Sequence, residues 1–318
     1  MKIIGGTQLK GNITAQGAKN AALPVMAAAI LLKGKKLKID RVPNLLDVVT
    51  MADLLRSLGA VVQFSDHEME ISTPEEISWE TPPDLVSKMR ASSLVLGPLL
   101  ARCGKAVMPL PGGCSIGSRP IDLHLKGLTR MGASIELVHG AVHARADGLR
   151  GCRIYLDFPS VGATENLMMA AVFAQGETVL ENTAREPEIF NLVEALRSMG
   201  AFIDADGTGV IRIKGVDDLG SASASVIPDR VEAATYILAG AATNGEVTVS
   251  DIIPNHIDSL LAKLEEAGAL MTIKETEVTI HSSGRLKAVS LKTLPYPGFP
   301  TDLQPQVMVA LCLAEGTS

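Results

Sequence analysis

One cysteine of this chain lies inside a glycine-rich segment that also carries an arginine. The segment reads PLPGGCSIGSRP over residues 109–120, with Cys114 near its centre and Arg119 near its end. Its glycines permit backbone geometry that a Cβ would forbid, and Pro120 suits the first turn of a helix. A guanidinium and a helix N-terminus both favour a thiolate and so lower the pKa of a nearby thiol. The segment predicts either an anion-binding loop with a reactive cysteine or a flexible surface loop with an incidental one.

Charged and polar residues also stand where Ala-rich helical runs begin. They are Lys19-Asn20, Arg90, Thr164-Glu165, Asp229-Arg230 and Asp302. Because helix N-termini attract anions, Lys19, Arg90 and Arg119 together predict a site for phosphate or carboxylate. Two alternatives stay open. Asp229 and Asp302 suit N-caps, and an acidic side chain could accompany Lys19 or Arg90 in place of a bound anion.

The elements that position these residues recur about every 70 residues. An Ala/Leu-rich helical run that ends in glycine and precedes a β-like run is found at Gly34, Gly104, Gly176, Gly245 and Gly316. A Leu-rich helical run that closes on Gly-Ala recurs in step, at Gly59, Gly132, Gly200 and Gly268. Glycine at these positions predicts a helix C-cap. Each repeat therefore predicts strand–helix–strand–helix and one or two further strands, in an α/β or α+β fold whose repeats bury their helices by associating.

The Cys114 segment is an insertion in this repeat. From the first glycine to the proline that opens the second helix there are 16 residues in the second repeat, Gly104 to Pro120, and 9 to 11 in the others. An added loop on a regular scaffold is a common place for chemistry or for a lid. We therefore interpret Cys114 as a functional residue.

Composition excludes several classes of protein. A chain of 318 residues predicts two domains, and a net charge of −6 argues against a nucleic-acid surface. No signal peptide is evident, and no apolar run reaches the roughly 18 residues of a membrane span. The four cysteines are scattered without a C-x-x-C pair, so we expect a reduced, cytoplasmic protein.

No motif for a metal or a nucleotide cofactor is found in the sequence. His139 and His143 lie four residues apart, but their segment predicts strand and turn without further ligands, so we expect no metal. Neither a P-loop nor a dinucleotide fingerprint is present. We expect no cofactor, and any phosphate bound here should belong to a substrate.

Seven segments taken together resemble the enolpyruvyl transferases that act on UDP-N-acetylglucosamine, the UDP-N-acetylglucosamine 1-carboxyvinyltransferases. They are GAKNAALP (17–24), KMRAS (88–92), PGGCSIGSRPIDL (111–123), SVGAT (160–164), AREPE (184–188), PDR (228–230) and FPTD (299–302). The resemblance implies six βαβαββ units that form two inverse α/β barrel domains. It places the first domain at residues 20–228 and the second at 1–19 with 229–318.

The resemblance also implies the reaction. The enolpyruvyl group of phosphoenolpyruvate would pass to the 3′-hydroxyl of UDP-N-acetylglucosamine with release of phosphate, in the first committed step of peptidoglycan synthesis. Cys114 would protonate C3 of phosphoenolpyruvate, and Asp302 would take the proton of the sugar hydroxyl. Cys114 is also the expected attachment point for phosphoenolpyruvate and for the inhibitor fosfomycin.

The remaining site residues follow from the same resemblance. Phosphoenolpyruvate is expected to contact Lys19, Asn20 and Arg119. UDP-N-acetylglucosamine is expected to contact Arg90, Arg119, Pro120, Ile121, Asp122, Leu123, Phe158, Pro159, Ser160, Val161 and Asp302. Phe158 departs from the pattern, because some relatives carry a lysine there near the diphosphate.

Two further expectations concern the extent of the chain and its alternatives. The fifth repeat stops at Ser318, soon after Gly316, so we expect a C-terminally truncated second domain and a chain that is inactive alone. A non-catalytic UDP-sugar-binding fragment is therefore one alternative. The other is 5-enolpyruvylshikimate-3-phosphate synthase, which has the same fold but lacks a cysteine in a PGGCSIG loop.

Overall fold

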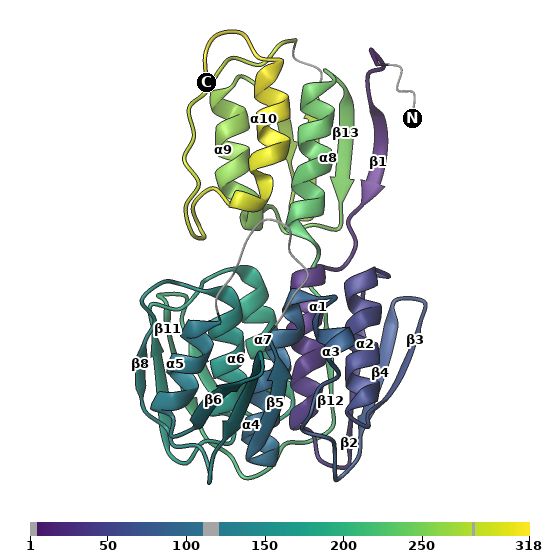
Figure 1. Cartoon of the computed structure of the whole chain (residues 1–318). Helices are drawn as coiled ribbons and strands as arrows, with labels where there is room; N and C mark the ends of the chain where they lie inside the picture. The colour runs from purple at the N-terminus through teal and green to yellow at the C-terminus, as the bar shows by residue number, and fades with distance from the viewer. Residues whose placement is uncertain (1–4, 111–120, 282–283) are drawn as a thin grey trace. The chain divides into compact units, whose positions relative to one another are not determined.

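The computed structural model describes residues 5–110, 121–281 and 284–318 and divides the chain into two compact units (Figure 1). The large unit is Ala18–Ile227, and the small unit combines Met1–Gly17 with Pro228–Ser318. Cys114, Arg119 and Pro120 lie outside the described residues.

The large unit contains three repeats. The first contains α1 (Lys19–Ala28), η1 (Ala29–Leu31), β2 (Lys35–Asp40), α2 (Leu46–Ser57), β3 (Val61–Ser65) and β4 (Glu68–Thr73). The second contains α3 (Pro83–Val86), η2 (Arg90–Val95), α4 (Leu96–Cys103), β5 (Lys105–Pro109), α5 (Asp122–Arg130), β6 (Ser134–Val138) and β7 (Ala141–Arg145). The third contains β8 (Arg153–Tyr155), α6 (Val161–Ala171), β9 (Glu177–Glu181), α7 (Pro187–Ser198), β10 (Phe202–Ala205) and β11 (Val210–Lys214), and β12 (Ala222–Ser225) follows it.

The three repeats place apolar helices inside and sheets outside (Figure 1). The sheets have the strand orders β12-β2-β4-β3, β5-β7-β6 and β10-β11-β9-β8. Every residue of α1 from Ala21 to Ala28 is buried, and so is every residue of α6 from Ala163 to Ala171. A helix that is buried on every side lies in a core. The strands instead alternate buried and exposed residues, as sheets with one solvated face do.

Close contact between the inner helices depends on a glycine. A Cβ on Gly97 of α4 would lie 2.2 Å from Asn166 Oδ1 and 2.3 Å from the Asn166 carbonyl oxygen. Such distances are closer than any side chain tolerates, so only glycine lets α4 approach α6 here.

The small unit contains the fourth repeat and the start of the fifth. Its elements are β1 (Lys10–Thr14), α8 (Arg230–Ala242), β13 (Glu246–Ser250), η3 (Pro254–Ile257), α9 (Asp258–Glu266), β14 (Leu270–Ile273), β15 (Glu277–His281), η4 (Thr301–Leu303) and α10 (Gln304–Cys312). Its sheet has the order β1-β13-β15-β14. A second core, formed by Leu260, Leu264 and Val249 among others, lies within this unit.

The predicted helix ends are confirmed. The strands that precede the first helix of a repeat, here called leading strands, do not all pair within their own repeat. Gly59, Gly132, Gly200 and Gly268 follow their helices at φ between +83° and +107°, as C-cap glycines do. The strand that precedes α1, β1, pairs in parallel with β13 of the fourth repeat, and β12, which precedes α8, pairs with β2 of the first. The first and fourth repeats thus exchange their leading strands, which the sequence pattern alone does not indicate.

Candidate active site

Each described site residue is positioned by the start of a helix. Lys19 and Asn20 open α1, Arg90 opens η2, and Asp122 opens α5. Residues 158–160 lead into α6, which begins at Val161, and Asp302 lies in η4 directly before α10. The predicted placement at helix starts is confirmed, while the roles of these residues stay predictions.

Lys19 has an acidic partner in the structure. Its Nζ lies 3.0 Å from Asp47 Oδ2, and both side chains are about two-fifths exposed (39% and 36%). Asp47 is in the first turn of α2, and α1 packs against α2. The alternative of an acidic partner therefore applies to Lys19. An anion that binds there must share the ammonium group with the carboxylate or take its place.

The two aspartates expected as possible N-caps differ. Asp229 caps α8, because its Oδ1 accepts hydrogen bonds from the backbone N–H groups of Val231 and Glu232 at 2.8 and 3.0 Å. Asp302 is exposed, and within the part of the chain that the structure describes its carboxylate makes no hydrogen bond or ion pair. The capping interpretation is confirmed for Asp229. It is wrong for Asp302, because η4, which contains this residue, and the following α10 both begin without a side-chain cap.

A buried amide joins three of the helix starts in the large unit. Asn166 Nδ2 donates to the carbonyl of Ser93, which follows Arg90 in η2, and to His124 Nδ1 of α5 at 2.9 Å. Asn166 Oδ1 accepts the backbone N–H of Gly97 in α4. The amide therefore fixes η2, α4 and α5 against α6. Neither Asn166 nor His124 is identified by the sequence analysis.

His124 is a neutral residue within this group. Its side chain is buried, and burial, together with the positive charge of Arg90, lowers its pKa to about 4. Because Asn166 donates to Nδ1, the ring proton belongs on Nε2. A Cβ on Gly162 would lie 3.4 Å from His124 Cε1, so the ring lies against the first turn of α6. His124 thus links α5, at whose start residues 121–123 of the expected contacts lie, with the first turn of α6, which follows residues 158–160.

Segment 158–161 is held by its own helix cap. The Ser160 hydroxyl accepts the backbone N–H of Ala163 at 3.4 Å, and the Ser160 N–H donates to the Phe158 carbonyl at 2.8 Å. Phe158 is 58% exposed. An aromatic ring is therefore exposed to solvent at this position, and it offers apolar surface without a positive charge.

Glu165 is a buried acid of α6, the helix that follows residues 158–160. It lies in the second turn of α6 with 3% of its surface exposed, and its Oε1 has no hydrogen-bond partner among the described residues. Burial raises its pKa well above the usual range, and the negative charges of Glu188 and Glu186 raise it further. The protonated form of the carboxyl group is thus favoured by its surroundings.

Neither a metal site nor a membrane span is found in the described part of the chain. Across the described ranges, no group of three or more His, Cys, Asp or Glu residues could hold a metal ion. None of the helices placed by the structure is long and apolar enough to cross a membrane.

Sequence comparison shows close relatives over the whole chain. The family model described as EPSP synthase (3-phosphoshikimate 1-carboxyvinyltransferase) matches residues 3–318. UDP-N-acetylglucosamine 1-carboxyvinyltransferase 2 of Carboxydothermus hydrogenoformans is 53% identical over 318 residues, which is 99% of this chain and 76% of that protein. UDP-N-acetylglucosamine 1-carboxyvinyltransferase of Halothermothrix orenii is 50% identical over 316 residues, with the same two shares.

Solved structures show the same fold at lower identity. The enolpyruvyl transferase NikO from Streptomyces tendae matches with a TM-score of 0.87 at 23% identity, over 98% of this chain and 74% of that chain. EPSP synthase from Acinetobacter baumannii matches with a TM-score of 0.70 at 19% identity, over 96% and 70%. These two likenesses concern the fold alone.

Proposed function

The chain belongs to the enolpyruvyl transferase family, among the UDP-N-acetylglucosamine 1-carboxyvinyltransferases, and we propose that it transfers the enolpyruvyl group of phosphoenolpyruvate to the 3′-hydroxyl of UDP-N-acetylglucosamine. Phosphate is the second product, and the reaction belongs to peptidoglycan synthesis, the building of the cell wall. The observation that carries this function is identity of 50–53% with enzymes of that name over 99% of the chain.

The same observation decides between the two possible acceptors. The EPSP synthase whose structure matches is only 19% identical, whereas half of all residues agree with the UDP-N-acetylglucosamine enzymes. EPSP synthase also lacks the cysteine of the PGGCSIG loop. The shikimate alternative is therefore the less supported one.

We propose Cys114 and Asp302 as the acid and the base of the reaction. The Cys114 thiol gives its proton to C3 of phosphoenolpyruvate, which leaves oxocarbenium character at C2. The sugar 3′-oxygen bonds to C2 while its proton passes to Asp302. C3 then returns a proton to the Cys114 thiolate as the C2–O bond to phosphate breaks, which restores both the double bond and the thiol. The uncapped carboxylate of Asp302 supports its part, because no hydrogen bond to a described residue occupies it.

The anionic groups of both substrates are assigned to cations and helix starts. We propose Lys19, Asn20 and Arg119 for phosphoenolpyruvate. Arg90 and residues 119–123 and 158–161 are proposed for UDP-N-acetylglucosamine. The buried Asn166–His124 pair supports the second assignment, because it joins η2, α5 and α6, the helices at whose starts Arg90 and the two segments lie.

Fosfomycin alkylation is expected at Cys114 and at neither half-buried cysteine. Burial raises the pKa of the Cys103 and Cys152 thiols, which leaves little of the reactive thiolate. The Cys152 thiol also donates to the Arg130 carbonyl at 3.4 Å. Cys152→Ala is therefore a matched control for substitutions of Cys114.

The test is phosphate release by the native protein from phosphoenolpyruvate and UDP-N-acetylglucosamine. Cys114→Ala should reduce it by at least about a hundredfold, as expected for loss of a general acid, with an unchanged circular dichroism spectrum. Cys114→Asp should retain activity and resist fosfomycin, because a carboxylic acid also donates a proton but is not alkylated in the same way. Full activity of a folded Cys114→Ala protein would overturn the assignment.

A further inference from the structure

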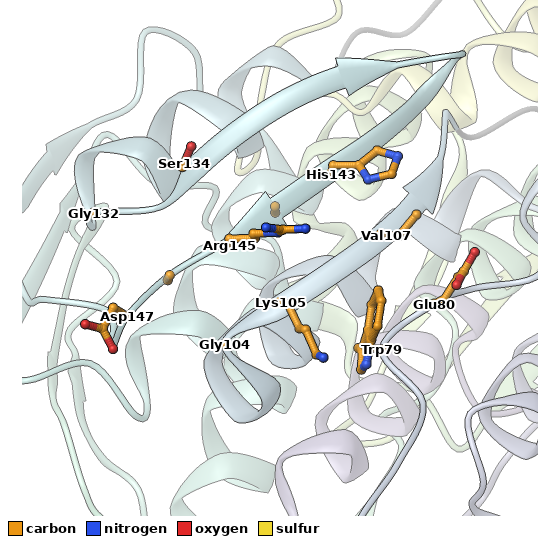
Figure 2. Close-up of a pocket in the computed structure, with 12 residues that line it drawn as sticks. Trp79, Glu80, Gly104, Lys105, Val107, Gly132, Ser134, His143, Arg145 and Asp147 are labelled. Carbon is orange, nitrogen blue, oxygen red and sulfur yellow. The ribbon is translucent and has the colours of Figure 1, made fainter.

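A hollow lies on the outer face of the second repeat's sheet. It has a volume of about 910 Å³ and is lined from β5, β6, β7 and the segment that contains Trp79 and Glu80 (Figure 2). That segment extends the sheet, because Glu80 bridges in parallel to Val107 and Val107 donates its N–H to the Trp79 carbonyl. None of the lining residues belongs to the proposed active site.

Two cations face each other across this sheet. Lys105 of β5 pairs directly with Arg145 of β7, and Ser134 of β6 is the other neighbour of Arg145. Like charges in directly opposed positions destabilise a sheet. Within the described residues neither cation has an ion pair. Lys105 instead places its ammonium group 4.2 Å from the centre of the Trp79 ring.

The other repeats avoid this arrangement at the same position. The residue after the repeat glycine is Glu177 in the third repeat, where it faces Lys214. In the fourth repeat it is Glu246, which pairs with Lys10 of the leading strand β1 and lies 3.9 Å from His281 Nδ1 of β15. In the first repeat, Lys35 faces the neutral Thr73 and forms an ion pair with Asp218. Among these four repeats, the second alone has two positive charges at this position. The fold of the repeat therefore does not require Lys105 to face Arg145.

The rest of the hollow indicates the kind of anion that fits. His143 lies on the same face as Arg145, with Glu80 at the Trp79 end of the hollow and Asp147 at the Gly132 end (Figure 2). These two carboxylates would repel a long polyanion that ran across the sheet. A small dianion between Lys105 and Arg145 would avoid both.

We propose that this hollow binds a phosphate monoester, with the phosphate dianion between Lys105 and Arg145 and the organic group against Trp79. An arginine fork and an ammonium group together match the charge and the several acceptor oxygens of a phosphate. The Trp79 ring and the hollow beside it provide apolar surface for the esterified group. The site is separate from the proposed active site and does not depend on its chemistry.

Trp79 is the chain's single tryptophan, so its fluorescence reports on this hollow alone. The experiment titrates the protein with inorganic phosphate, and in parallel with glycerol 3-phosphate, at an ionic strength held constant with sodium chloride. A bound phosphate draws the Lys105 ammonium group away from the ring, so the emission should change and saturate with both probes. Lys105→Gln and Arg145→Gln should each raise the half-saturating concentration about tenfold or more.

Two controls separate binding at this site from general effects of salt and charge. Lys36→Gln removes an exposed cation from the first repeat's sheet, where Lys36 forms an ion pair with Glu70, and should leave the half-saturating concentration within about twofold. Arg145→Glu should abolish the response while raising the melting temperature, because it converts the opposed cations into a cross-strand ion pair.

Three results would overturn the proposal. One is an emission change that follows ionic strength without saturating, and another is saturation that Lys105→Gln and Arg145→Gln leave unchanged. The third is a response to a single-stranded DNA oligonucleotide but to neither phosphate probe. The measurement needs no turnover, so failure of the proposed transferase function would leave it intact, and its own failure would leave that function intact.

Discussion

At the scale of single residues, two aspartates near the starts of equivalent helices have different roles. Asp229 and Asp302 stand before equivalent helices, yet Asp229 uses its carboxylate to cap α8 and Asp302 does not act as a cap. Both are aspartates close to the start of an Ala-rich helical run, so sequence reasoning could only leave both alternatives open. The difference arises from the backbone, since a 3₁₀ turn (Thr301–Leu303) precedes α10.

The ion pair of Lys19 gives a prediction at this scale. Lys19→Ala should shift the melting temperature by no more than a few degrees, because exposed ion pairs contribute about 0–1 kcal/mol. It should weaken phosphoenolpyruvate binding by the native protein about tenfold or more, since a hydrogen bond to a charged group contributes about 1.5–3 kcal/mol. Calorimetric titration and thermal unfolding measure the two effects.

Lys126→Ala is the matched control, because Lys126 forms an exposed ion pair with Asp157 outside the proposed site. It should change neither quantity appreciably. A large loss of stability in Lys19→Ala, with unchanged phosphoenolpyruvate binding, would identify the Lys19–Asp47 pair as purely structural.

The sequence indicates Lys19 and Arg90 but not the residues that support them. Helix starts can be located from glycine, proline and apolar runs, so the cations at those starts can be identified from the sequence alone. His124 and Asn166 became recognisable only when the second and third repeats were packed together, because their burial and their hydrogen bond join residues 42 positions apart. The opposed Lys105 and Arg145 likewise required the strand register.

At the scale of helices, α6 and α7 each bury a glutamate, Glu165 and Glu188, and the charge of Glu188 acts on Glu165. The pKa of Glu165 is raised above that of the unfolded chain, so between the unfolded value and the folded value the folded protein holds a proton that the unfolded chain releases. The bound proton therefore stabilises the folded protein. This stabilisation is fully present at pH values below the pKa of the unfolded chain, about 4.3, and is lost as the pH rises through the pKa of the folded protein.

Glu165→Gln should remove that dependence. The amide keeps the size of the side chain and cannot ionise, so we expect a flatter dependence of unfolding free energy on pH between 5 and 8. At pH 8 the variant should be more stable than the native sequence by roughly 1 kcal/mol, within the usual range for single substitutions. Denaturant unfolding at several pH values measures this.

Glu194→Gln on α7 provides the control, since Glu194 is exposed and pairs with Arg197. It should leave the slope of stability against pH as it is. The same slope in Glu165→Gln as in the native sequence would show that Glu165 is ionised in the folded protein.

At the scale of the whole molecule, two units with separate cores predict two unfolding transitions. The cores of the large and the small unit share no residues, and we propose that the units correspond to the two domains of the family, 20–228 and 1–19 with 229–318. Most residues proposed for UDP-N-acetylglucosamine belong to the large unit. The ligand should therefore raise chiefly the unfolding temperature of the large unit. At a ligand concentration a hundredfold above the dissociation constant, its binding adds about 2.7 kcal/mol to the free energy of unfolding.

Differential scanning calorimetry with and without UDP-N-acetylglucosamine measures this, and UDP-glucose serves as a control for the N-acetyl group. A single transition that moves as a whole would show that the two units unfold as one cooperative body.

The repeats and the helix ends of this chain could be predicted from the spacing of its glycines. The exchange of leading strands between the first and fourth repeats could not, because β1 and β12 carry no signal of their partner.

Acceptor choice tests the central claim most directly. The native protein is supplied with phosphoenolpyruvate and either UDP-N-acetylglucosamine or shikimate 3-phosphate, and phosphate release is followed together with the mass of the product. We expect phosphate release with UDP-N-acetylglucosamine, a product in which the enolpyruvyl group is on the 3′-oxygen, and no release with shikimate 3-phosphate. Release with shikimate 3-phosphate and none with the UDP-sugar would contradict it.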